Sequence, residues 1–195
     1  EFAKYANAPI VNALSDLEHP CQAMADIMTI QQHRGELRGQ RVAYIGDGNN
    51  TAASLAIACA SVGADFVIAA PTDYQIPSPA WEEAKGRASE SQSKIGWVEL
   101  PQQAARGADV VYTDTWVSMG QDDETEVRLE AFKEYQVNEE LMSHAKPDAL
   151  FMHDLPAYEG KEIAPGMIDH PRSVVFDQAE NRLHAQKAIL AGVVT

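Results

Sequence analysis

Residues 41–71 constrain the fold more than any other stretch of this 195-residue chain. They read RVAYIGDGNNTAASLAIACASVGADFVIAAP: an apolar strand, a glycine-containing turn, an alanine-rich helix and a second apolar strand that ends at Pro71. Two strands joined tightly through a crossover helix form a βαβ unit, in which the strands are parallel and buried on both faces. We therefore expect a chain built around a parallel sheet.

The same alternation continues to the end of the chain. Expected helices cover residues 78–91, 101–108, 138–145 and 179–194, and expected strands cover 95–100, 109–116 and 149–155, with one more short apolar run at 172–178. Alternating strands and helices are typical of an open, doubly wound parallel sheet with helices on both faces. The predicted fold class is α/β.

A further strand and helix are expected ahead of this unit. Residues 6–14 are apolar and β-branched, which favours a short strand that leads into a helix. Ser15 or Asp16 could cap that helix. Pro20 suits its first turn, and Gly35 offers a stop.

Charge and cysteine content exclude several classes of protein. The chain carries 15 lysine and arginine residues against 29 aspartate and glutamate residues, a net charge of −14 that repels nucleic acid. No apolar run approaches the roughly 20 residues of a membrane-spanning helix, and the amino end has no signal-like pattern. Cys21 and Cys59 lie among apolar and small residues, which favours buried thiols. We expect a cytoplasmic protein that binds neither membrane nor nucleic acid.

Three of the expected strands end on polar clusters, at residues 46–50, 114–120 and 153–156. In open parallel sheets, ligands bind beyond the carboxyl ends of the strands, where loops converge and helix amino ends present free amides. The three clusters should therefore lie on one rim of the sheet. Their convergence is the strongest physical indication of a site.

Each cluster also has a structural interpretation. The turn at 46–48 resembles the opening of a dinucleotide-binding turn, but the third glycine is missing and no acidic residue ends the second strand. Asp114 could cap a helix, and the acidic run at 121–126 indicates a solvated loop. His153 and Asp154 would point to opposite faces of a strand, so both can face one ligand only if the strand has already ended.

Two helices could add groups to the same rim. His19 and Gln22 are three residues apart on one helical turn, so they share a face and could address one small polar ligand. Taken alone, His19 could equally be a capping or surface group. Arg182, near the start of the last helix, could hold an oxyanion or phosphate oxygen, or form a surface ion pair.

Taken together, these clusters resemble a known family. The signatures are His19-Pro20-Cys21-Gln22, Gly46-Asp47-Gly48-Asn49-Asn50, Asp114-Thr115-Trp116-Val117-Ser118-Met119-Gly120, Leu155-Pro156 and Ala179-Glu180-Asn181-Arg182. In this order and spacing they are similar to the ornithine carbamoyltransferases of the aspartate/ornithine transcarbamylase family. The resemblance implies transfer of the carbamoyl group from carbamoyl phosphate to the side-chain amine of L-ornithine, which gives L-citrulline and phosphate in arginine metabolism.

The resemblance also implies roles on the carbamoyl side of the site. His19 would polarise the carbonyl, Gln22 would contact the carbamoyl amide, and the Leu155 backbone and Arg182 would complete the pocket. Donor and positive groups stabilise the oxygen that gains charge, and holding two small reactants together lowers the entropic barrier. Neither a cofactor, a metal nor a covalent nucleophile is then expected.

On the amino-acid side, the resemblance places Asn50 against the ornithine carboxylate region and Asp114 against the α-ammonium group. Ser118 and Met119 would belong to a loop that closes over the amino acid. Closure of such a loop excludes water, which protects carbamoyl phosphate and strengthens the electrostatic interactions in the site.

The sequence departs from the family pattern in two places. Family members that use ornithine usually have cysteine where this chain has Asp154. A carboxylate there could take a catalytic part by accepting a hydrogen bond from the ornithine side-chain amine, with altered affinity or pH dependence. The Ser-x-Arg-Thr phosphate loop of the family's amino-terminal domain does not occur in the sequence. We therefore expect a chain that lacks most of that carbamoyl-phosphate domain and makes little citrulline alone.

The resemblance implies a division of the chain. Residues 1–33 would be the end of the carbamoyl-phosphate domain with a connecting helix, 34–176 the ornithine-binding domain, and 177–195 a helix that returns toward the first domain. The expected partners are L-ornithine and carbamoyl phosphate. The intact family enzyme is expected to be a homotrimer, and family trimers assemble through the missing domain.

Three alternatives stay open. The chain could be a transcarbamylase-like amino-acid-binding protein that has lost catalysis, a carbamoyltransferase with another amine acceptor, or a nucleotide-binding oxidoreductase domain. Ornithine binding would exclude the oxidoreductase. Turnover after addition of the missing domain would exclude the inactive binding protein.

Overall fold

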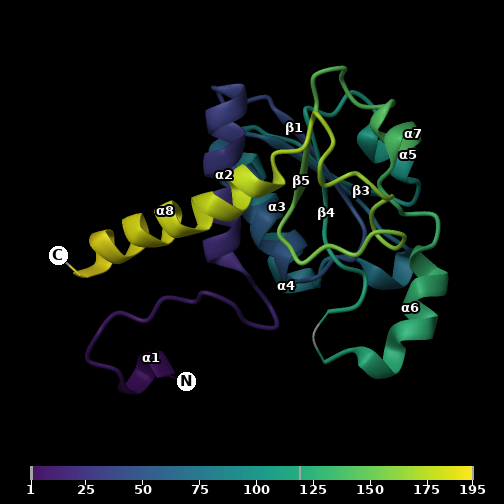
Figure 1. The fold of residues 1–195 in the computed structure, drawn as a ribbon. Coiled ribbons are helices and arrows are strands. Elements are labelled where there is room, and N and C mark those ends of the chain that lie inside the picture. Colours follow the sequence, from purple (N-terminus) through teal and green to yellow (C-terminus); the bar gives the residue numbers. More distant parts are fainter. Residues whose placement is uncertain (1, 119, 195) are drawn as a thin grey trace.

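A computed structural model describes residues 2–118 and 120–194. Five parallel strands form one sheet in the order β3-β2-β1-β4-β5 (Figure 1). Their bounds are β1 Arg41–Ile45, β2 Asp65–Ala69, β3 Ile95–Val98, β4 Val110–Thr113 and β5 Leu150–His153. The chain moves outward from β1 to β2 and β3 and then crosses back to β4 and β5, so its direction reverses between β1 and β4. The expected doubly wound parallel sheet is confirmed.

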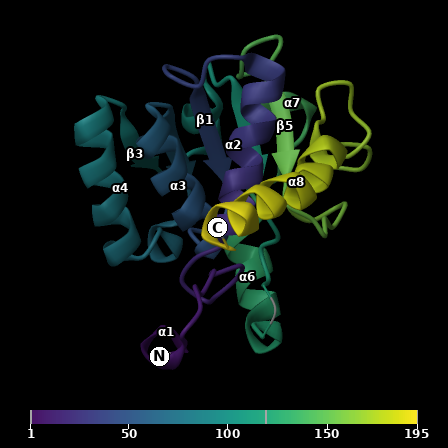
Figure 2. The ribbon, with the colours of Figure 1, turned by 90° about the vertical axis from the view of Figure 1, so that its left-hand side faces the viewer.

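Helices cover both faces of the sheet (Figures 1 and 2). One face carries α2 Pro20–Arg34, α3 Asn50–Val62 and α4 Ser78–Ser91, and the other carries α5 Pro101–Ala105, α6 Thr125–Phe132 and α7 Glu139–Met142. The last helix, α8 Val175–Val194, packs across α2 and then extends away from the sheet, while the short α1, Phe2–Tyr5, lies apart at the amino end (Figure 1). Two 3-10 turns, η1 Thr72–Tyr74 and η2 Asp122–Glu124, complete the set of helical elements in the described ranges.

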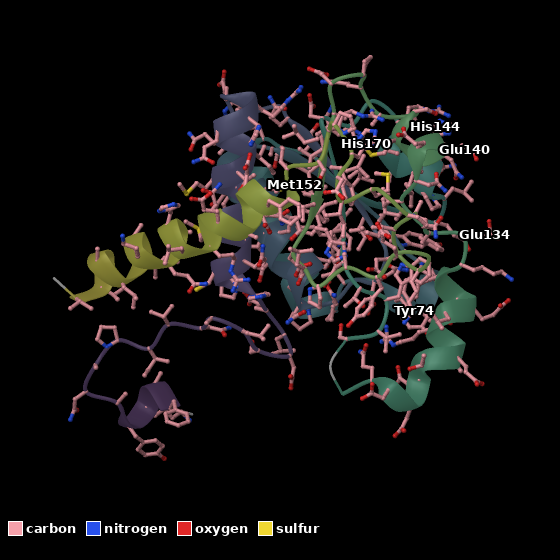
Figure 3. All side chains as sticks on the ribbon, in the orientation of Figure 1. Tyr74, Glu134, Glu140, His144, Met152 and His170 are labelled. Atoms are coloured by element: carbon pink, nitrogen blue, oxygen red, sulfur yellow. The ribbon has the colours of Figure 1, made fainter. Side chains whose placement is uncertain are left out.

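The central strands are buried because helices cover both of their faces. All four residues of β4 are buried, as are four of the five residues of β1. Alternate residues enter different core layers: Tyr44 packs toward α2 and α3, whereas Ile45 packs toward the opposite helices. Tyr44 stacks on Tyr112 of β4 with ring centroids 5.5 Å apart. Met152 of β5, labelled in Figure 3, belongs to the same layer as these two tyrosines.

The turn after β1 is fixed by close packing at Gly48. A Cβ atom at this position would lie 2.2 Å from the backbone nitrogen of Ile76 and 2.3 Å from the backbone carbonyl carbon of Gln75. The Gly48 amide also donates to the Tyr74 carbonyl at 2.8 Å. The turn is therefore pressed against the segment that follows β2, which sets the direction in which the residues after Gly48 leave the sheet.

The amino-terminal segment differs from the expectation. Residues 6–18 form no strand, because no strand of the sheet lies beside them to accept their hydrogen bonds, and β-branched composition alone does not supply a pairing partner. His19, rather than Ser15 or Asp16, is the N-cap residue of α2, and it forms no side-chain cap. Pro20 in the first turn and the stop at Gly35 are confirmed.

The acidic run and the last helix also differ from the expectation. Residues 121–126 contain η2 and the first residues of α6, which an ion pair of 2.9 Å between Arg128 and Glu124 stabilises across one helical turn. The helix α8 begins at Val175, so the apolar run at 172–178 adds no strand and forms only an isolated bridge at Ser173. Arg182 therefore lies two turns inside α8 rather than near its start.

Two further expectations concern cysteines and membranes. Cys21 and Cys59 are buried free thiols, as predicted. Burial raises the pKa of the Cys59 thiol. Within the described ranges, no helix combines the length and the apolar character needed to cross a membrane.

Candidate active site

The polar residues that follow β1, β4 and β5 meet at the carboxyl edge of the sheet, as predicted. The strand β5 ends at His153, so Asp154 lies beyond it and is free of the strand alternation. One ligand atom from each of Asp114, His153 and Asp154 lies within 4.8 Å of the other two. The rim therefore holds two carboxyl groups and an imidazole at the point where the strand order reverses.

Asp154 is poorly supplied with hydrogen-bond donors. Its Oδ2 accepts from the Thr51 hydroxyl at 3.1 Å, while its Oδ1 is buried and has no partner among the described residues. The side chain is only 8% exposed. Burial, and after it the charge of Asp114, hold the pKa of Asp154 well above the usual range of an aspartate. Asp154 thus holds its proton more tightly than an exposed aspartate does, and a cation bound beside it could take the place of that proton.

Asn49 supports the other carboxyl group. Its Nδ2 donates to Asp114 Oδ2 at 2.7 Å, and its Oδ1 accepts from the Ala52 amide at 3.0 Å, which caps α3. The Thr115 amide donates to the remaining oxygen of Asp114 at 2.6 Å. The sequence directed attention to Asn50, whose amide instead donates to the Ser15 carbonyl at 2.8 Å. Asn49 is therefore the asparagine that contacts Asp114, and Asn50 faces the amino-terminal segment.

His19 lies at the start of α2 and is almost fully buried. Its Nδ1 lies 2.6 Å from the Ala13 carbonyl oxygen, which can only accept, so Nδ1 carries a proton. Burial lowers the pKa of His19, and the positive charge of Arg182 lowers it further. The neutral ring consequently offers a lone pair at Nε2. A hydrogen bond donated from Nε2 requires the protonated ring.

Gln22 and Arg182 meet where α8 crosses α2. Arg182 Nη1 donates to Gln22 Oε1, and Gln22 Nε2 donates to Asp26 at 2.8 Å. The predicted approach of these two residues from opposite ends of the chain is therefore present. Asp26 was not singled out from the sequence, although its position four residues after Gln22 places both on one helix face.

The segment after β4 is held by a residue that the sequence patterns did not reveal. Arg128 of α6 donates to Asp47 Oδ2 at 2.7 Å and to the Trp116 carbonyl at 3.1 Å, and its guanidinium lies over the ring of Tyr74, labelled in Figure 3. The Ser118 amide donates to Gln121 Oε1 at 2.9 Å. Met119, which the family resemblance places in the closing loop, lies outside the described residues.

Leu155 follows the acidic rim in an unusual backbone conformation, with φ of 60°. Its amide donates to His153 Nδ1 at 2.9 Å, so the neutral His153 ring carries its proton on Nε2. That nitrogen lies 3.4 Å from Glu162 Oε1, and both side chains are fully buried. His153 and Glu162 thus fix the turn that presents Asp154 and the Leu155 backbone to the site.

The same rim contains residue types that ligate metals. Carboxylate oxygens from Asp114 and Asp154 and a His153 nitrogen are suitable ligands for a divalent cation. The two His153 nitrogens already face the Leu155 amide and Glu162, however. A cation held by all three residues would have to displace one of these contacts.

The fold and the site define a class: a doubly wound α/β domain whose charged side chains gather at the switch point of its sheet, the place where ligands bind in such folds. Comparison with known proteins identifies the family. The family model for the aspartate/ornithine carbamoyltransferase Asp/Orn binding domain matches residues 38–193, and the carbamoyl-P binding domain of the same family matches residues 1–32. The chain belongs to the aspartate/ornithine carbamoyltransferase family.

Individual relatives agree with this assignment. The chain is 55% identical to an ornithine carbamoyltransferase of Methanopyrus kandleri over 98% of its own length and 61% of the relative's. It is 51% identical to an anabolic ornithine carbamoyltransferase of Pyrococcus furiosus, of which it covers 62%. The solved Pyrococcus furiosus enzyme superposes with a TM-score of 0.93 at 52% identity, over 97% of this chain and 60% of that one. The chain thus spans about three fifths of the length of the proteins that it matches.

Proposed function

We propose that the chain takes part in the transfer of a carbamoyl group from carbamoyl phosphate to the side-chain amine of L-ornithine, which yields L-citrulline and phosphate. The observation that carries the proposal is the buried pair of carboxyl groups, Asp114 and Asp154, at the switch point of the sheet. A cationic amino acid would take the place of the proton on Asp154.

The two sides of the site suit the two reactants. The carboxyl groups of the rim attract the ammonium groups of ornithine, with Asp114 proposed at the α-ammonium group. Across the site, Arg182 and His19 offer donors for the carbamoyl oxygen as it gains negative charge. Gln22 and the Leu155 backbone would contact the carbamoyl amide. Asn50, Ser118 and Met119 are proposed to enclose the amino acid.

Asp154 is proposed as a catalytic group. The amine that attacks a carbonyl must be neutral, and a carboxylate beside the ornithine side-chain ammonium can accept its proton. The Oδ1 of Asp154, which has no hydrogen-bond partner among residues 2–118 and 120–194, is suited to that contact. For His19, only the protonated ring donates from Nε2, so the proposed polarisation of the carbonyl should weaken as the pH rises above the lowered pKa of His19.

The assembly forms part of the same proposal. Residues 1–33 would contribute the end of the carbamoyl-phosphate domain, residues 34–176 would bind ornithine, and residues 177–195 would return toward the first domain. The phosphate-binding groups would come from carbamoyl-phosphate-domain residues outside this sequence, so we expect little citrulline synthesis by residues 1–195 alone. A homotrimer in the cytoplasm is proposed from the family resemblance.

A second candidate is a carbamoyltransferase that uses another amine acceptor. Asp154 favours it, because a carboxyl group at this position adds negative charge where family members that use ornithine usually have a thiol. An acceptor with more positive charge, or without an α-carboxylate, would fit such a rim better than ornithine does.

Titration of the labelled chain with ornithine, followed by backbone amide NMR, tests the proposal. Putrescine, which lacks the carboxylate, and aspartate, which lacks the second amine, are the controls. We expect saturable shifts at residues 49–50, Asp114 and residues 118–120 with ornithine, and a matched loss of these shifts in Asp114→Asn. Stronger shifts with putrescine would favour the second candidate. An absence of shifts with ornithine would mean that the amino-acid site requires the carbamoyl-phosphate-domain residues outside this sequence, or that Asp154 serves a different function.

A further inference from the structure

Asp26 is a fully buried carboxyl group at the junction of three elements. It lies in α2 and faces β4 and α8. Its Oδ1 accepts from Gln22 Nε2 at 2.8 Å and from Gln178 Nε2 at 2.7 Å, and its Oδ2 accepts from the Tyr112 hydroxyl at 3.1 Å. Gln178 also accepts from the His153 amide at 3.0 Å, which links the same junction to the end of β5. Within the described residues, the side-chain hydrogen-bond partners of Asp26 are Gln22, Gln178 and Tyr112, and they do not include Asp114 or Asp154.

The partners of Gln22 determine which way its amide points. A side-chain amide can be turned by 180° with little change in shape, so its orientation is set by what its two ends contact. One end of Gln22 meets Asp26, a carboxyl group that accepts. The other end meets the guanidinium of Arg182, which can only donate. Nitrogen must therefore face Asp26, and oxygen must face Arg182.

We propose that Asp26 is a positioning residue: by holding Gln22 Nε2, it keeps the Gln22 carbonyl oxygen turned toward Arg182 and the ligand, where it can accept a hydrogen bond from a primary amide. The carbamoyl group of carbamoyl phosphate carries such an amide, and this part of the inference rests on the proposed function. Without the acceptor at Asp26, the Gln22 amide loses the contact that sets its orientation.

The protonation of Asp26 does not remove this effect. Burial raises the pKa of Asp26 to about 7, so the group is partly protonated near neutral pH. Both glutamine amides use Oδ1, whereas Oδ2 faces only the Tyr112 hydroxyl. A proton on Oδ2 leaves Oδ1 as an acceptor. An asparagine can place its carbonyl oxygen at the same position, whereas a leucine of similar size cannot accept at all.

Three variants of the chain separate positioning from packing. Asp26→Asn keeps one acceptor, and Asp26→Leu removes both. Thr29→Val is the matched control, because Thr29 lies one turn further along α2 and accepts from Asn181 of α8 at 2.9 Å without touching Gln22. If Asp26→Leu does not fold, Asp26→Ala, which leaves room for water beside Tyr112 and Gln178, replaces it.

The first measurement is hydrogen exchange of the Gln22 side-chain amide by NMR. We expect protected protons in the parent, in Asp26→Asn and in Thr29→Val, and exchange at least about tenfold faster in Asp26→Leu. The second measurement is the affinity for phosphonoacetamide, a stable compound with a primary amide and a phosphonate. It should fall about tenfold in Asp26→Leu and stay within about threefold of the parent in the other two variants.

The outcomes distinguish this inference from the proposed function. Equal protection of Gln22 in the parent and in Asp26→Leu would overturn the inference. So would faster exchange in Asp26→Leu with no change in the affinity for phosphonoacetamide. If none of the proteins binds phosphonoacetamide and only Asp26→Leu releases Gln22, the orientation by Asp26 is supported, and the contact of Gln22 with a carbamoyl amide gains no support.

Discussion

Buried aspartates at the two ends of the sheet differ in how many hydrogen-bond donors surround them. At the amino end, Asp109 precedes β4 and accepts from Arg34 at 2.8 Å, from Lys146 at 2.7 Å and from the Arg41 amide at 2.9 Å. At the carboxyl end, Asp154 accepts from one hydroxyl and keeps one oxygen without a partner in the described part of the chain. Both side chains are nearly inaccessible to solvent.

The two environments shift the pKa of the carboxyl group in opposite directions. Burial acts against ionisation of Asp109, but the Lys146 ammonium and its other donors outweigh it and lower the pKa of this carboxyl. Burial and Asp114 raise the pKa of Asp154. A carboxylate with several donors stabilises the fold, whereas an under-supplied carboxyl group beside another is retained where a ligand can complete it.

The largest expected contrast is in pH dependence. Burial gives Asp26 a folded-state pKa of about 7 against the model-peptide value of 3.8, so between these values the folded chain holds a proton that the unfolded chain has lost. Stability should therefore fall as the pH rises through this window. We expect the parent to lose roughly 3 kcal/mol relative to Asp26→Asn between pH 5 and pH 8. Urea unfolding at both pH values measures this difference, and parallel pH profiles for the two proteins would contradict it.

Removing Asp109, the carboxylate that accepts from three donors, should have the next largest effect on the free energy of unfolding. Asp109→Ala removes the acceptor of the Arg41 amide and one of the acceptors of the Arg34 guanidinium in a buried place, and we expect a loss of about 2 kcal/mol in the free energy of unfolding. Because the pKa of Asp109 is lowered, its contribution to the parent should be present above the unfolded pKa and disappear on acidification. Ornithine affinity should not change in this variant, and a matching loss of affinity would mean that the two ends are coupled.

The reverse pattern is expected at the carboxyl end. Asp154→Asn removes a carboxyl group whose ionisation is opposed by burial and by Asp114, so the free energy of unfolding at pH 8 should stay constant or rise. Ornithine affinity should fall about tenfold, because the second carboxylate is lost. Asp154→Cys is the matched variant that carries the usual family residue. Identical affinities and pH profiles in Asp154→Cys and the parent would show that the carboxyl group has no special role.

The smallest effect is expected at Asp148, at the exposed edge of the charged groups around Asp109. Asp148 also contacts Arg34, at 2.8 Å, but its side chain is 70% exposed. Water screens such a pair, so Asp148→Ala should leave the free energy of unfolding nearly unchanged. A loss as large as that of Asp109→Ala would show that exposure does not separate these two carboxylates.

The sheet could be predicted from the sequence because each strand is a short apolar run between helices. The segment at 6–14 has similar composition but no strand beside it, and sequence alone does not reveal which strands acquire neighbours. The helix α6 was missed because its acidic start is held by contacts of Arg128 with distant residues, Asp47 and the Trp116 carbonyl.

The part of the site that depends only on the strand order could be predicted from the sequence. Asp114 and Asp154 follow neighbouring strands, so the parallel sheet brings them together. The choice between Asn49 and Asn50 depends on where α3 begins, which a sequence locates only within a few residues. Asp26 could not be recognised in the sequence as a buried group, because its partners Tyr112 and Gln178 are distant in the chain.

The packing at Gly48 affects what a genome search with the Gly-Asp-Gly-Asn-Asn pattern can identify. The backbone of Gln75 and Ile76 occupies the space of any side chain at this position. Natural selection would keep glycine there even in a descendant that had lost all enzymatic activity. A glycine at this position therefore indicates the fold and common descent. A sequence that keeps Gly48 but changes Asp114 or Asp154 has the same fold, and its activity does not follow from the glycine.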